Sequence, residues 1–324
     1  MTTKALIHKN GKARTSQIVI PPQKAVTLDD LRGPYLQQLN EGYEARRHGR
    51  PLGPVIGIAE KFNKQCRGYL TPGLHILVGM PGSGKSALAA QIAANAECGV
   101  LYVTYEMSVE ELMNRNISRE TGTWIDRFHD YRIGPKEAAR LYERTKTKMP
   151  WVVHFDGTRP GSDITELKNA AIAAKRNAGS PHLLIIIDSV HAMVRNGGLV
   201  GPDGRNVSEY TGMNIAVSRL MGIAHELKAA LFLIGEQSKT NMNTNGMSGA
   251  DSRALEYAPN LFISLTCDLR KKPDSNGNLD VTAHFSKNRR GEPRKNVALN
   301  FHGRTMTFSQ STFAVEDDED EDDE

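Results

Sequence analysis

The sequence contains no hydrophobic run long enough to cross a membrane. Its longest purely aliphatic stretch is Leu183–Ile187, whereas a transmembrane helix needs about 20 apolar residues. The N-terminus, MTTKALIHKNGKARTSQ, is basic, but no apolar segment follows it that could form the centre of a secretory signal. We therefore expect a cytoplasmic protein without a membrane association.

Cysteine is also scarce. The three cysteines, Cys66, Cys98 and Cys267, are odd in number and show no C-x-x-C spacing, which argues against a disulfide framework and against a zinc site. The chain has no internal repeat. With 39% hydrophobic and 24% charged residues it has ordinary globular composition, and 324 residues suffice for one large domain or two small ones.

Acidic residues are unevenly distributed along the chain. The last nine residues, 316–324, are all Asp or Glu, and the rest of the chain has 41 basic and 28 acidic residues, a net charge of +13. So basic a body suits a polyanionic partner, while a run of like charges cannot fold alone. Two interpretations of the tail remain open: a solubilising extension, or a peptide that mimics nucleic acid and binds a basic partner or the protein's own DNA groove.

The pattern of breaks and charges divides the chain into four parts. Residues 1–26 are predicted to be a flexible basic arm, and residues 27–55 a linker helix region whose helix over 28–47 is interrupted at Gly33-Pro34. Residues 56–310 form one α/β domain, followed by an acidic disordered tail at 311–324.

Within 56–310, apolar strand patterns alternate with helical periodicity. We predict helices at 86–96, 108–120, from about 135, at 162–178 and at 213–227; residues 124–134 are expected to form a loop. Strands are expected at 74–79, 99–106, 151–155, 183–188 and 231–237, and then at 261–268, 279–287, 297–302 and 305–310, where only turns separate them. The prediction is a mostly parallel twisted sheet flanked by helices, ending in an antiparallel meander.

The segment GMPGSGKS at 79–86 fits the pattern G-x-x-x-x-G-K-[ST]. Its glycines let the backbone curl so that N–H groups surround a phosphate, and the following helix presents its positive end to the same anion. Lysine at this position reaches the β and γ phosphates, and the serine hydroxyl is a Mg²⁺ ligand. We therefore predict an ATP and Mg²⁺ site made of Gly79, Pro81, Gly82, Ser83, Gly84, Lys85 and Ser86.

Two carboxylates end other apolar strands. Asp188 closes LLIIID, and because ligands in open α/β sheets lie beyond the carboxyl ends of the strands, it is a candidate second Mg²⁺ anchor beside Ser86. Glu106 closes LYVTYE and could deprotonate water as a general base. From spacing alone, Glu106 could equally be an acid favoured by the dipole of the helix that follows.

Gln237 ends the strand LFLIGEQ, where a neutral amide could sense the γ phosphate. A long polar loop follows Gln237 at 238–253, and another lies after Asp188 at 195–210. Such loops in compact domains are usually functional or disordered. Either they are surface disorder or they hold a DNA backbone without reading its sequence. The DNA-binding candidates are Arg195, Arg205, Lys239, Asn241, Asn243 and Arg253.

The segment SKNRRGEP at 286–293 gathers Lys287, Arg289 and Arg290 at the end of a strand. Such a cluster can complete a neighbouring subunit's ATP site by supplying positive charge to the transition state. A solvated turn is the alternative.

These segments together resemble the RecA-like ATPase core of the DnaB-type hexameric replicative helicases. YVTYEMSVEELMNR is similar to that family's catalytic glutamate segment, here Glu106, and SRLMGIAHELKAALFLIGEQSKTN to the helix leading to its glutamine sensor, here Gln237. SGADSRALEYAPNLFISL is similar to the segment beyond the DNA-facing loop. FSKNRRG resembles the family's Lys-x-Arg finger, placing Lys287 and Arg289 in a neighbour's site. The resemblance spans about residues 56–310.

The sequence also departs from that family. Residues 1–55 are too short for the usual N-terminal domain that docks primase, and DSVHAM and KNRRG look more like the RecA and RadA branches. The zinc-binding cysteines and the C-terminal protease-like domain of RadA are absent.

The resemblance implies an ATP-hydrolysing, DNA-dependent helicase that translocates on single-stranded DNA as a homo-oligomeric, hexameric ring. Its size suits phage or plasmid replication, which would place it in the cytoplasm of a bacterial host, with the acidic tail as a candidate site for a replication partner. Two alternatives remain open: a RecA/RadA-like recombination ATPase, and an ATP-switched loader or scaffold without unwinding activity.

Overall fold

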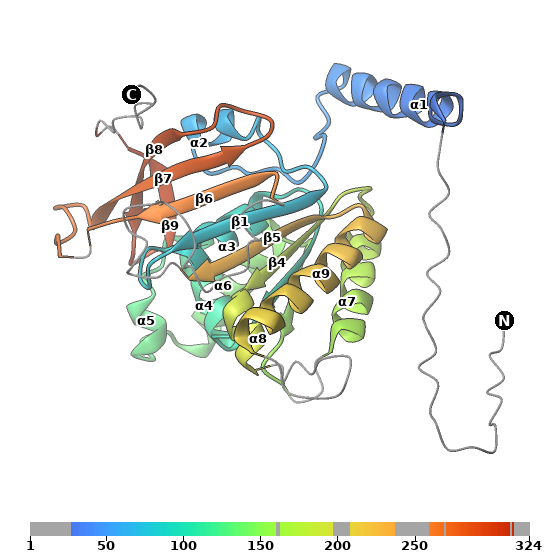
Figure 1. Cartoon of the computed structure of the whole chain (residues 1–324). Coiled ribbons are helices and arrows are strands. Elements are labelled where there is room, and N and C mark those ends of the chain that lie inside the picture. Colours follow the sequence, from blue (N-terminus) through green and yellow to red (C-terminus); the bar gives the residue numbers. More distant parts are fainter. Residues whose placement is uncertain are drawn as a thin grey trace, which may run out of the picture. The chain divides into compact units, whose positions relative to one another are not determined.

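The computed structural model describes residues 27–159, 163–196, 208–236, 259–268, 270–311 and 313. Contacts divide the chain into two units, Met1–Gly49 and Arg50–Glu324. Figure 1 shows the elements of both. Nowhere in the described ranges is a helix both long enough and apolar enough to span a bilayer.

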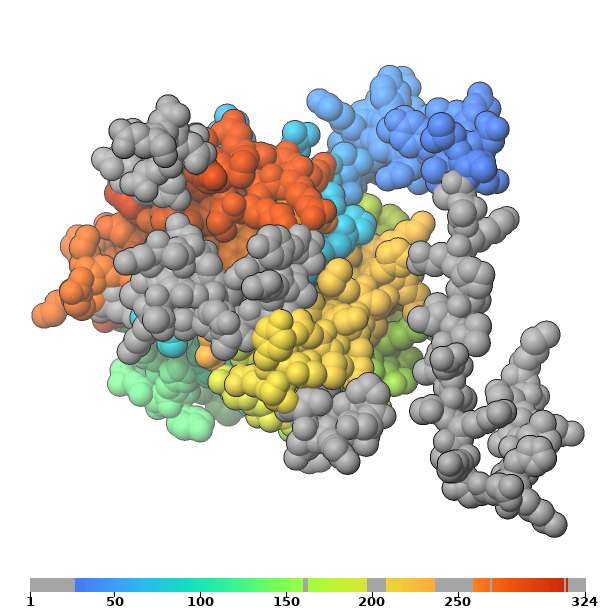
Figure 2. Space-filling model, in the orientation of Figure 1, coloured from blue at the N-terminus to red at the C-terminus, as the bar shows by residue number. Residues whose placement is uncertain are grey.

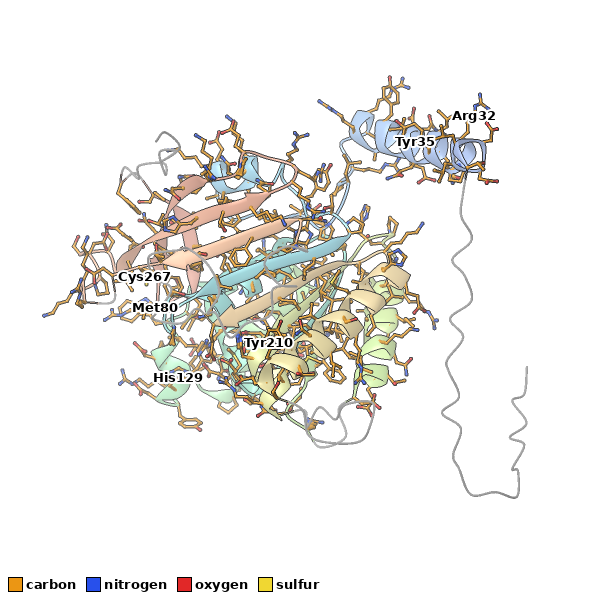
Figure 3. All side chains as sticks on the ribbon, in the orientation of Figure 1. Arg32, Tyr35, Met80, His129, Tyr210 and Cys267 are labelled. Atoms are coloured by element: carbon orange, nitrogen blue, oxygen red, sulfur yellow. The ribbon has the colours of Figure 1, made fainter. Side chains whose placement is uncertain are left out.

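The described part of the first unit is a single helix, α1 (Leu28–Arg47). It begins with a capping box in which the Thr27 side chain accepts a hydrogen bond from the Asp30 amide and the Asp30 carboxylate accepts one from the Thr27 amide. The predicted interruption at Gly33-Pro34 is wrong, because Pro34 lies inside a continuous helix. A proline removes one backbone donor, and the rest of the helix is retained. Arg32 and Tyr35 project from it in Figure 3.

The second unit is built on a nine-stranded sheet in the order β3-β2-β4-β5-β1-β6-β7-β8-β9. The strands are β1 (Gly73–Gly79), β2 (Gly99–Thr104), β3 (Val152–Asp156), β4 (Leu183–Asp188), β5 (Ala230–Glu236), β6 (Leu261–Thr266), β7 (Asn278–Asn288), β8 (Lys295–His302) and β9 (Thr307–Gln310). The helices are α2 (Glu60–Gln65), α3 (Lys85–Asn95), α4 (Val109–Thr121), α5 (Asp126–His129), α6 (Pro135–Lys148), α7 (Ile164–Ala178), α8 (Val190–Asn196) and α9 (Glu209–Leu227).

The sheet separates two hydrophobic cores because successive side chains of a strand point to opposite faces. In β4, Leu184 and Ile186 pack with α2 and α3 on one face, whereas Ile185 and Ile187 pack with α7, α8 and α9 on the other. Because the parallel strands are buried on both faces, their sequences are nearly continuous runs of apolar residues. Figure 2 shows strands β6–β8, in orange and red, and α9, in yellow, on one face of this unit.

The predicted fold class is confirmed, with differences at several elements. Strands β1 to β6 are parallel, and β7, β8 and β9 continue as an antiparallel meander. Strand β6, expected within the meander, pairs in parallel with β1 and so joins the two parts. The loop expected at 124–134 contains the short helix α5, and α2 was not predicted.

Helix starts follow the local capping chemistry. Ser108 caps α4 by accepting from the Glu111 amide, and Asp163 caps α7 by accepting from the amides of Thr165 and Glu166. Helix α9 begins earlier than the apolar pattern indicated, because the Ser208 hydroxyl accepts from the Thr211 amide.

The parallel part of the sheet creates one functional edge. Strands β1, β2, β4 and β5 run in the same direction, so their carboxyl ends, from Gly79 to Glu236, meet there. Met80 and Cys267, which follow the neighbouring parallel strands β1 and β6, lie close together at this edge in Figure 3.

Candidate functional site

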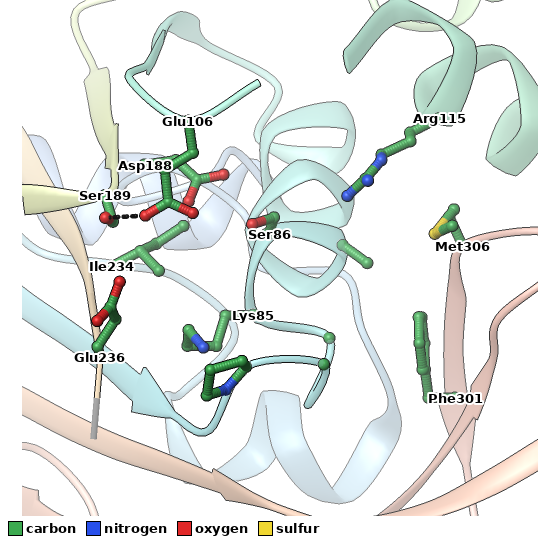
Figure 4. Close-up of a pocket in the computed structure, with 14 residues that line it drawn as sticks. Lys85, Ser86, Glu106, Arg115, Asp188, Ser189, Ile234, Glu236, Phe301 and Met306 are labelled. Carbon is green, nitrogen blue, oxygen red and sulfur yellow. Dashed lines mark hydrogen bonds between the residues drawn. The ribbon is translucent and has the colours of Figure 1, made fainter. Parts of the chain in front are cut away.

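A cleft of about 350 Å³ lies at the carboxyl edge of the parallel strands (Figure 4). This volume is in the range of small-molecule sites. Its lining comes from the phosphate loop, the ends of β2, β4 and β5, helix α4 and the β8–β9 hairpin. The lining residues are Pro81, Gly82, Gly84, Lys85, Ser86, Ala87, Glu106, Arg115, Asp188, Ser189, Ile234, Glu236, Phe301 and Met306.

The phosphate loop is held in a shape that only glycine allows at position 84. Gly84 has φ of 88°, and a Cβ there would lie 2.7 Å from Phe308 Cζ. Helix α3 starts at Lys85 without a side-chain cap, which leaves its first N–H groups and positive end facing the loop. The Ser83 hydroxyl is buried and has no hydrogen-bond partner among the described residues.

Lys85 lies across the mouth of this loop. Its ammonium donates to the carbonyl oxygens of Gly79 and Met80, at 2.8 and 2.9 Å. Burial lowers the pKa of Lys85, while the nearby carboxylates of Glu106, Asp188 and Glu236 act in the opposite direction. The loop therefore holds a partly desolvated cation at the N-terminus of a helix, an arrangement that fits a phosphate group.

Asp188 and Ser86, the predicted pair of metal ligands, lie together. Asp188 is 1% exposed; its carboxylate accepts from the Tyr102 hydroxyl at 2.8 Å and from the Ser86 side chain. Burial raises the pKa of Asp188, and those two hydrogen bonds and Lys85 oppose the rise. A hydroxyl and a carboxylate beside a phosphate loop fit Mg²⁺, which takes one or two protein ligands together with phosphate oxygens and water.

Glu106 also faces the cleft, as its place at a strand end predicted. It is exposed, and its carboxylate accepts a hydrogen bond from the Ser189 hydroxyl (Figure 4). Helix α4 begins only at Val109, after the Ser108 cap, and carries its own first-turn acids Glu110 and Glu111. Glu106 therefore lies outside that helix, which disfavours its interpretation as a helix N-terminal acid.

A third carboxylate, Glu236, lines the same cleft at the end of β5. It forms an ion pair with Arg195 of α8 at 3.0 Å, and its amide donates to His191 Nδ1. The expected placement of Arg195 in a loop is wrong, because α8 extends to Asn196. Of the DNA-binding candidates, Arg205, Lys239, Asn241, Asn243 and Arg253 lie outside the described residues, as does the predicted sensor Gln237.

The opposite end of the cleft is less polar. Phe301, which stacks on Phe308 with ring centroids 4.7 Å apart, and Met306 line it on one side. Arg115 lines it on another and is held by Glu111, whose carboxylate accepts from Arg115 Nε at 2.8 Å. An apolar surface facing a guanidinium is suited to a flat aromatic ring such as a nucleobase.

Lys287 and Arg289 are absent from this cleft. Leu265 of β6 pairs with Gly79 beside the phosphate loop, whereas Lys287 of β7 pairs with Phe262. Three strand residues separate the two positions, about 10 Å along the strand direction. Both basic residues therefore lie toward the edge of the sheet opposite the phosphate loop.

The sequence analysis did not identify several residues of this site. Glu236 ends a buried strand just as Asp188 does, so the same pattern would have found it. Arg115 lies four residues after Glu111, a spacing that predicts an ion pair on a helix but not a cleft. Tyr102, Phe301 and Met306 carry no local signal, since they reach the site through strand order and the hairpin.

Comparisons with known proteins agree with this architecture. The model of the DnaB-like helicase C terminal domain family matches residues 57–310. A solved structure described as an ATPase domain superposes with a TM-score of 0.65 at 17% identity, covering 86% of this chain and 98% of that one. "The Structure Of A DnaB-Like Replicative Helicase And Its Interactions With Primase" gives a TM-score of 0.66 at 17% identity, covering 89% and 67%. No curated protein matches the sequence.

Proposed function

The chain belongs to the DnaB-like helicase C-terminal domain family, and from this premise we propose that it is an ATP-driven helicase that translocates on single-stranded DNA. One observation carries the proposal. A phosphate loop, a buried carboxylate and an exposed carboxylate converge on one cleft, while the basic Lys287 and Arg289 of the same chain lie at the opposite edge of the sheet.

In this proposal the residues of one subunit bind the nucleotide. The ammonium of Lys85 leaves the loop carbonyls and contacts the β and γ phosphates, and the free amides at the start of α3 contact the same anion. Ser86 and Asp188 would hold Mg²⁺, whose charge would neutralise that of the phosphates. Arg115, Phe301 and Met306 enclose the base.

Glu106 then orients and deprotonates the attacking water. Its carboxylate points into the cleft, and the Ser189 hydroxyl holds one oxygen in place, which leaves the other to accept the proton. Burial keeps Asp188 beside Ser86 rather than in contact with solvent. The two carboxylates therefore have separate roles, one for the metal and one for the water.

The set of residues needed for hydrolysis is complete only where two subunits meet. We place Lys287 and Arg289 in the nucleotide cleft of a neighbouring copy, where they stabilise the charge that develops on the γ phosphate. A head-to-tail contact of this kind repeats around a closed ring, and a hexamer is the form that the family resemblance implies. Gln237 and the loop at 238–253 link phosphate loss to the grip on DNA, and the basic body, with a net charge of +13 outside the tail, attracts the DNA backbone.

Mixing two variants with strongly reduced ATP hydrolysis tests this shared site. Lys85→Ala removes the phosphate-binding cation of a subunit's own cleft, and Arg289→Ala removes the finger donated to a neighbour. In a 1:1 mixture about one quarter of head-to-tail interfaces regain an intact cleft and an intact finger, so ATP hydrolysis should return to a measurable fraction of the original rate.

The control is Glu106→Gln mixed with Lys85→Ala. Both changes damage the cleft of the subunit that carries them, so no interface is restored and the mixture should stay inactive. If Arg289→Ala alone keeps full turnover, or if the first mixture shows no recovery, the intersubunit site is wrong. Electron micrographs with a non-hydrolysable ATP analogue and an oligonucleotide separate a closed ring from the open filament of a recombinase.

A further inference from the structure

The turn at residues 288–291, which follows Lys287 and contains Arg289, is fixed to the rest of the core by side-chain contacts. We call it the finger turn. Neighbouring side chains here differ in environment: Arg289 is exposed and Lys287 half-buried, whereas Asn288 is buried. The contacts of Asn288 and Arg290 therefore hold the turn to the protein.

Arg290 packs against Tyr69. Its guanidinium carbon lies 4.4 Å from the centroid of the Tyr69 ring, and Nη2 donates to the Tyr69 hydroxyl at 2.5 Å. A guanidinium is planar, and stacking with a hydrogen bond at its rim fixes both its position and its rotation. Of the two neighbouring arginines, Arg290 is held against an aromatic ring, and Arg289 has an exposed side chain.

Asn288 fixes the backbone of the same turn. Its Oδ1 accepts from the amides of Arg290 and Gly291, at 3.2 and 2.9 Å, and its Nδ2 donates to the carbonyl oxygen of Gln65 at 2.9 Å. The fit to the end of α2 is close: a Cβ on Gly291 would lie 2.4 Å from that same carbonyl oxygen. One amide side chain thus closes the turn and anchors it.

The backbone of Arg289 has its own anchor. Its amide donates to the carbonyl oxygen of Asn260 at 2.9 Å, and the Asn260 amide donates to that of Leu74 at 2.7 Å. Asn260 Nδ2 in turn donates to the carbonyl oxygen of Pro72. The finger turn is consequently tied to three segments distant in sequence: the end of α2, residue 69, and the chain entering β1.

This arrangement is not the one that stability alone would favour. A cavity of about 20 Å³, lined by Tyr69, His75 and Arg290 among others, lies beside the turn. His75 Nδ1 and Arg290 Nη1 are buried and have no hydrogen-bond partner within the described part of the chain. An unpaired buried donor destabilises the folded state, and an aliphatic side chain covering Tyr69 would avoid that cost. Local departures of this kind are expected at functional sites.

We propose that Arg290 and Asn288 are positioning residues that hold the finger turn against Tyr69 and Gln65, so that Arg289 enters a neighbour's ATP site already ordered. This inference rests on the proposed function of Lys287 and Arg289. In this proposal Arg290 acts through Arg289. A pre-ordered finger avoids the loss of side-chain and backbone freedom that a mobile turn would suffer in the transition state.

The first test is Arg290→Ala, with Arg270→Ala as the matched control. Arg270 lies in the β6–β7 turn, at the opposite end of β7 from the finger turn. Its side chain is 92% exposed and, among the contacts described, pairs only with Asp268. Arg290→Ala should lower kcat for ATP hydrolysis about 10- to 100-fold, the range for a misplaced catalytic group. The dissociation constant for a fluorescent ATP analogue should stay unchanged, because the cleft is at the other edge of the sheet. Arg270→Ala should match the original protein in both.

Tyr69→Phe supports the test if Arg290→Ala folds poorly. This variant keeps the ring and removes only the hydroxyl that accepts a hydrogen bond from Arg290. The fall in kcat should therefore be smaller, about 3-fold, which corresponds to roughly 0.7 kcal/mol at RT of 0.59 kcal/mol. Amide exchange at Gly291, whose N–H is bonded to Asn288, should become faster in both variants. Unchanged kcat in both folded variants would overturn the proposal.

A double-mutant cycle separates this inference from the proposed function. If Arg290 acts only through Arg289, then Arg290→Ala should lower kcat less than about 2-fold in an Arg289→Ala background. Equal losses in the two backgrounds would refute the positioning role and leave the finger itself intact. If Arg289→Ala alone has no effect on kcat, the proposed role of Arg289 in a neighbour's site is refuted, and the positioning role of Arg290 is refuted with it.

Discussion

Acid should destabilise the core through His75, and the effect can be calculated from its surroundings. His75 is 3% exposed in β1, with Nε2 2.7 Å from the Thr71 carbonyl oxygen. Burial lowers its pKa to about 4, and the charge of Arg290 acts in the same direction. Since the unfolded chain has a pKa near 6.5, it binds more protons than the folded protein below that pH.

The contribution of neutral, buried His75 to the free energy of unfolding is fully present above pH 6.5 and is lost as the pH falls from 6.5 toward 4. For a pKa of about 4 against 6.5, linkage gives a loss of about 2 kcal/mol between pH 8 and pH 5 from this one side chain. For a core of this size the melting temperature would fall by about 4–8 °C.

Urea denaturation at pH 8, 6 and 5 measures the effect, comparing the original protein with His75→Gln. The variant keeps an amide donor but cannot titrate, so its free energy of unfolding should fall about 2 kcal/mol less over this range. His48→Gln, at an exposed position after α1, is the control and should follow the original protein. Equal acid losses for the original protein and His75→Gln would refute the reasoning.

Four further predictions concern the nucleotide cleft and DNA binding. Gly84→Ala should abolish nucleotide binding and lower the melting temperature, because alanine at φ of 88° costs about 1–2 kcal/mol and its Cβ would lie 2.7 Å from Phe308; calorimetry checks both. Tyr102→Phe removes the donor to Asp188, so the Asp188 pKa should rise further and the Mg²⁺ needed for half-maximal hydrolysis should increase about 3- to 10-fold, more at pH 6 than at pH 8; an equal shift at both pH values would contradict this. DNA affinity should fall with salt at about one counterion per phosphate contact, and deleting residues 316–324 should tighten binding if the tail competes with DNA, measured by fluorescence anisotropy.

The sequence by itself determined the parts of the protein whose chemistry is local. The phosphate loop follows from eight consecutive residues, because glycine at position 84 and the start of a helix at Lys85 create the anion site without help from distant segments. The caps at Ser108 and Asp163 and the buried strand ending at Asp188 are local in the same sense. The sequence also predicted that Ser86, Asp188 and Glu106 lie at one site, because parallel strands bring their carboxyl ends to one edge of the sheet.

The tertiary structure decided which side chains meet from separate segments. Tyr102 reaches Asp188 because β2 and β4 are neighbours in the sheet, although 86 residues separate the two in the sequence. Arg290 meets Tyr69 across 221 residues, and no pattern near either one predicts the other. Local sequence sets backbone conformation through short-range sterics and hydrogen bonds, whereas strand order and register, which are global properties of the packed core, choose the partners of each side chain.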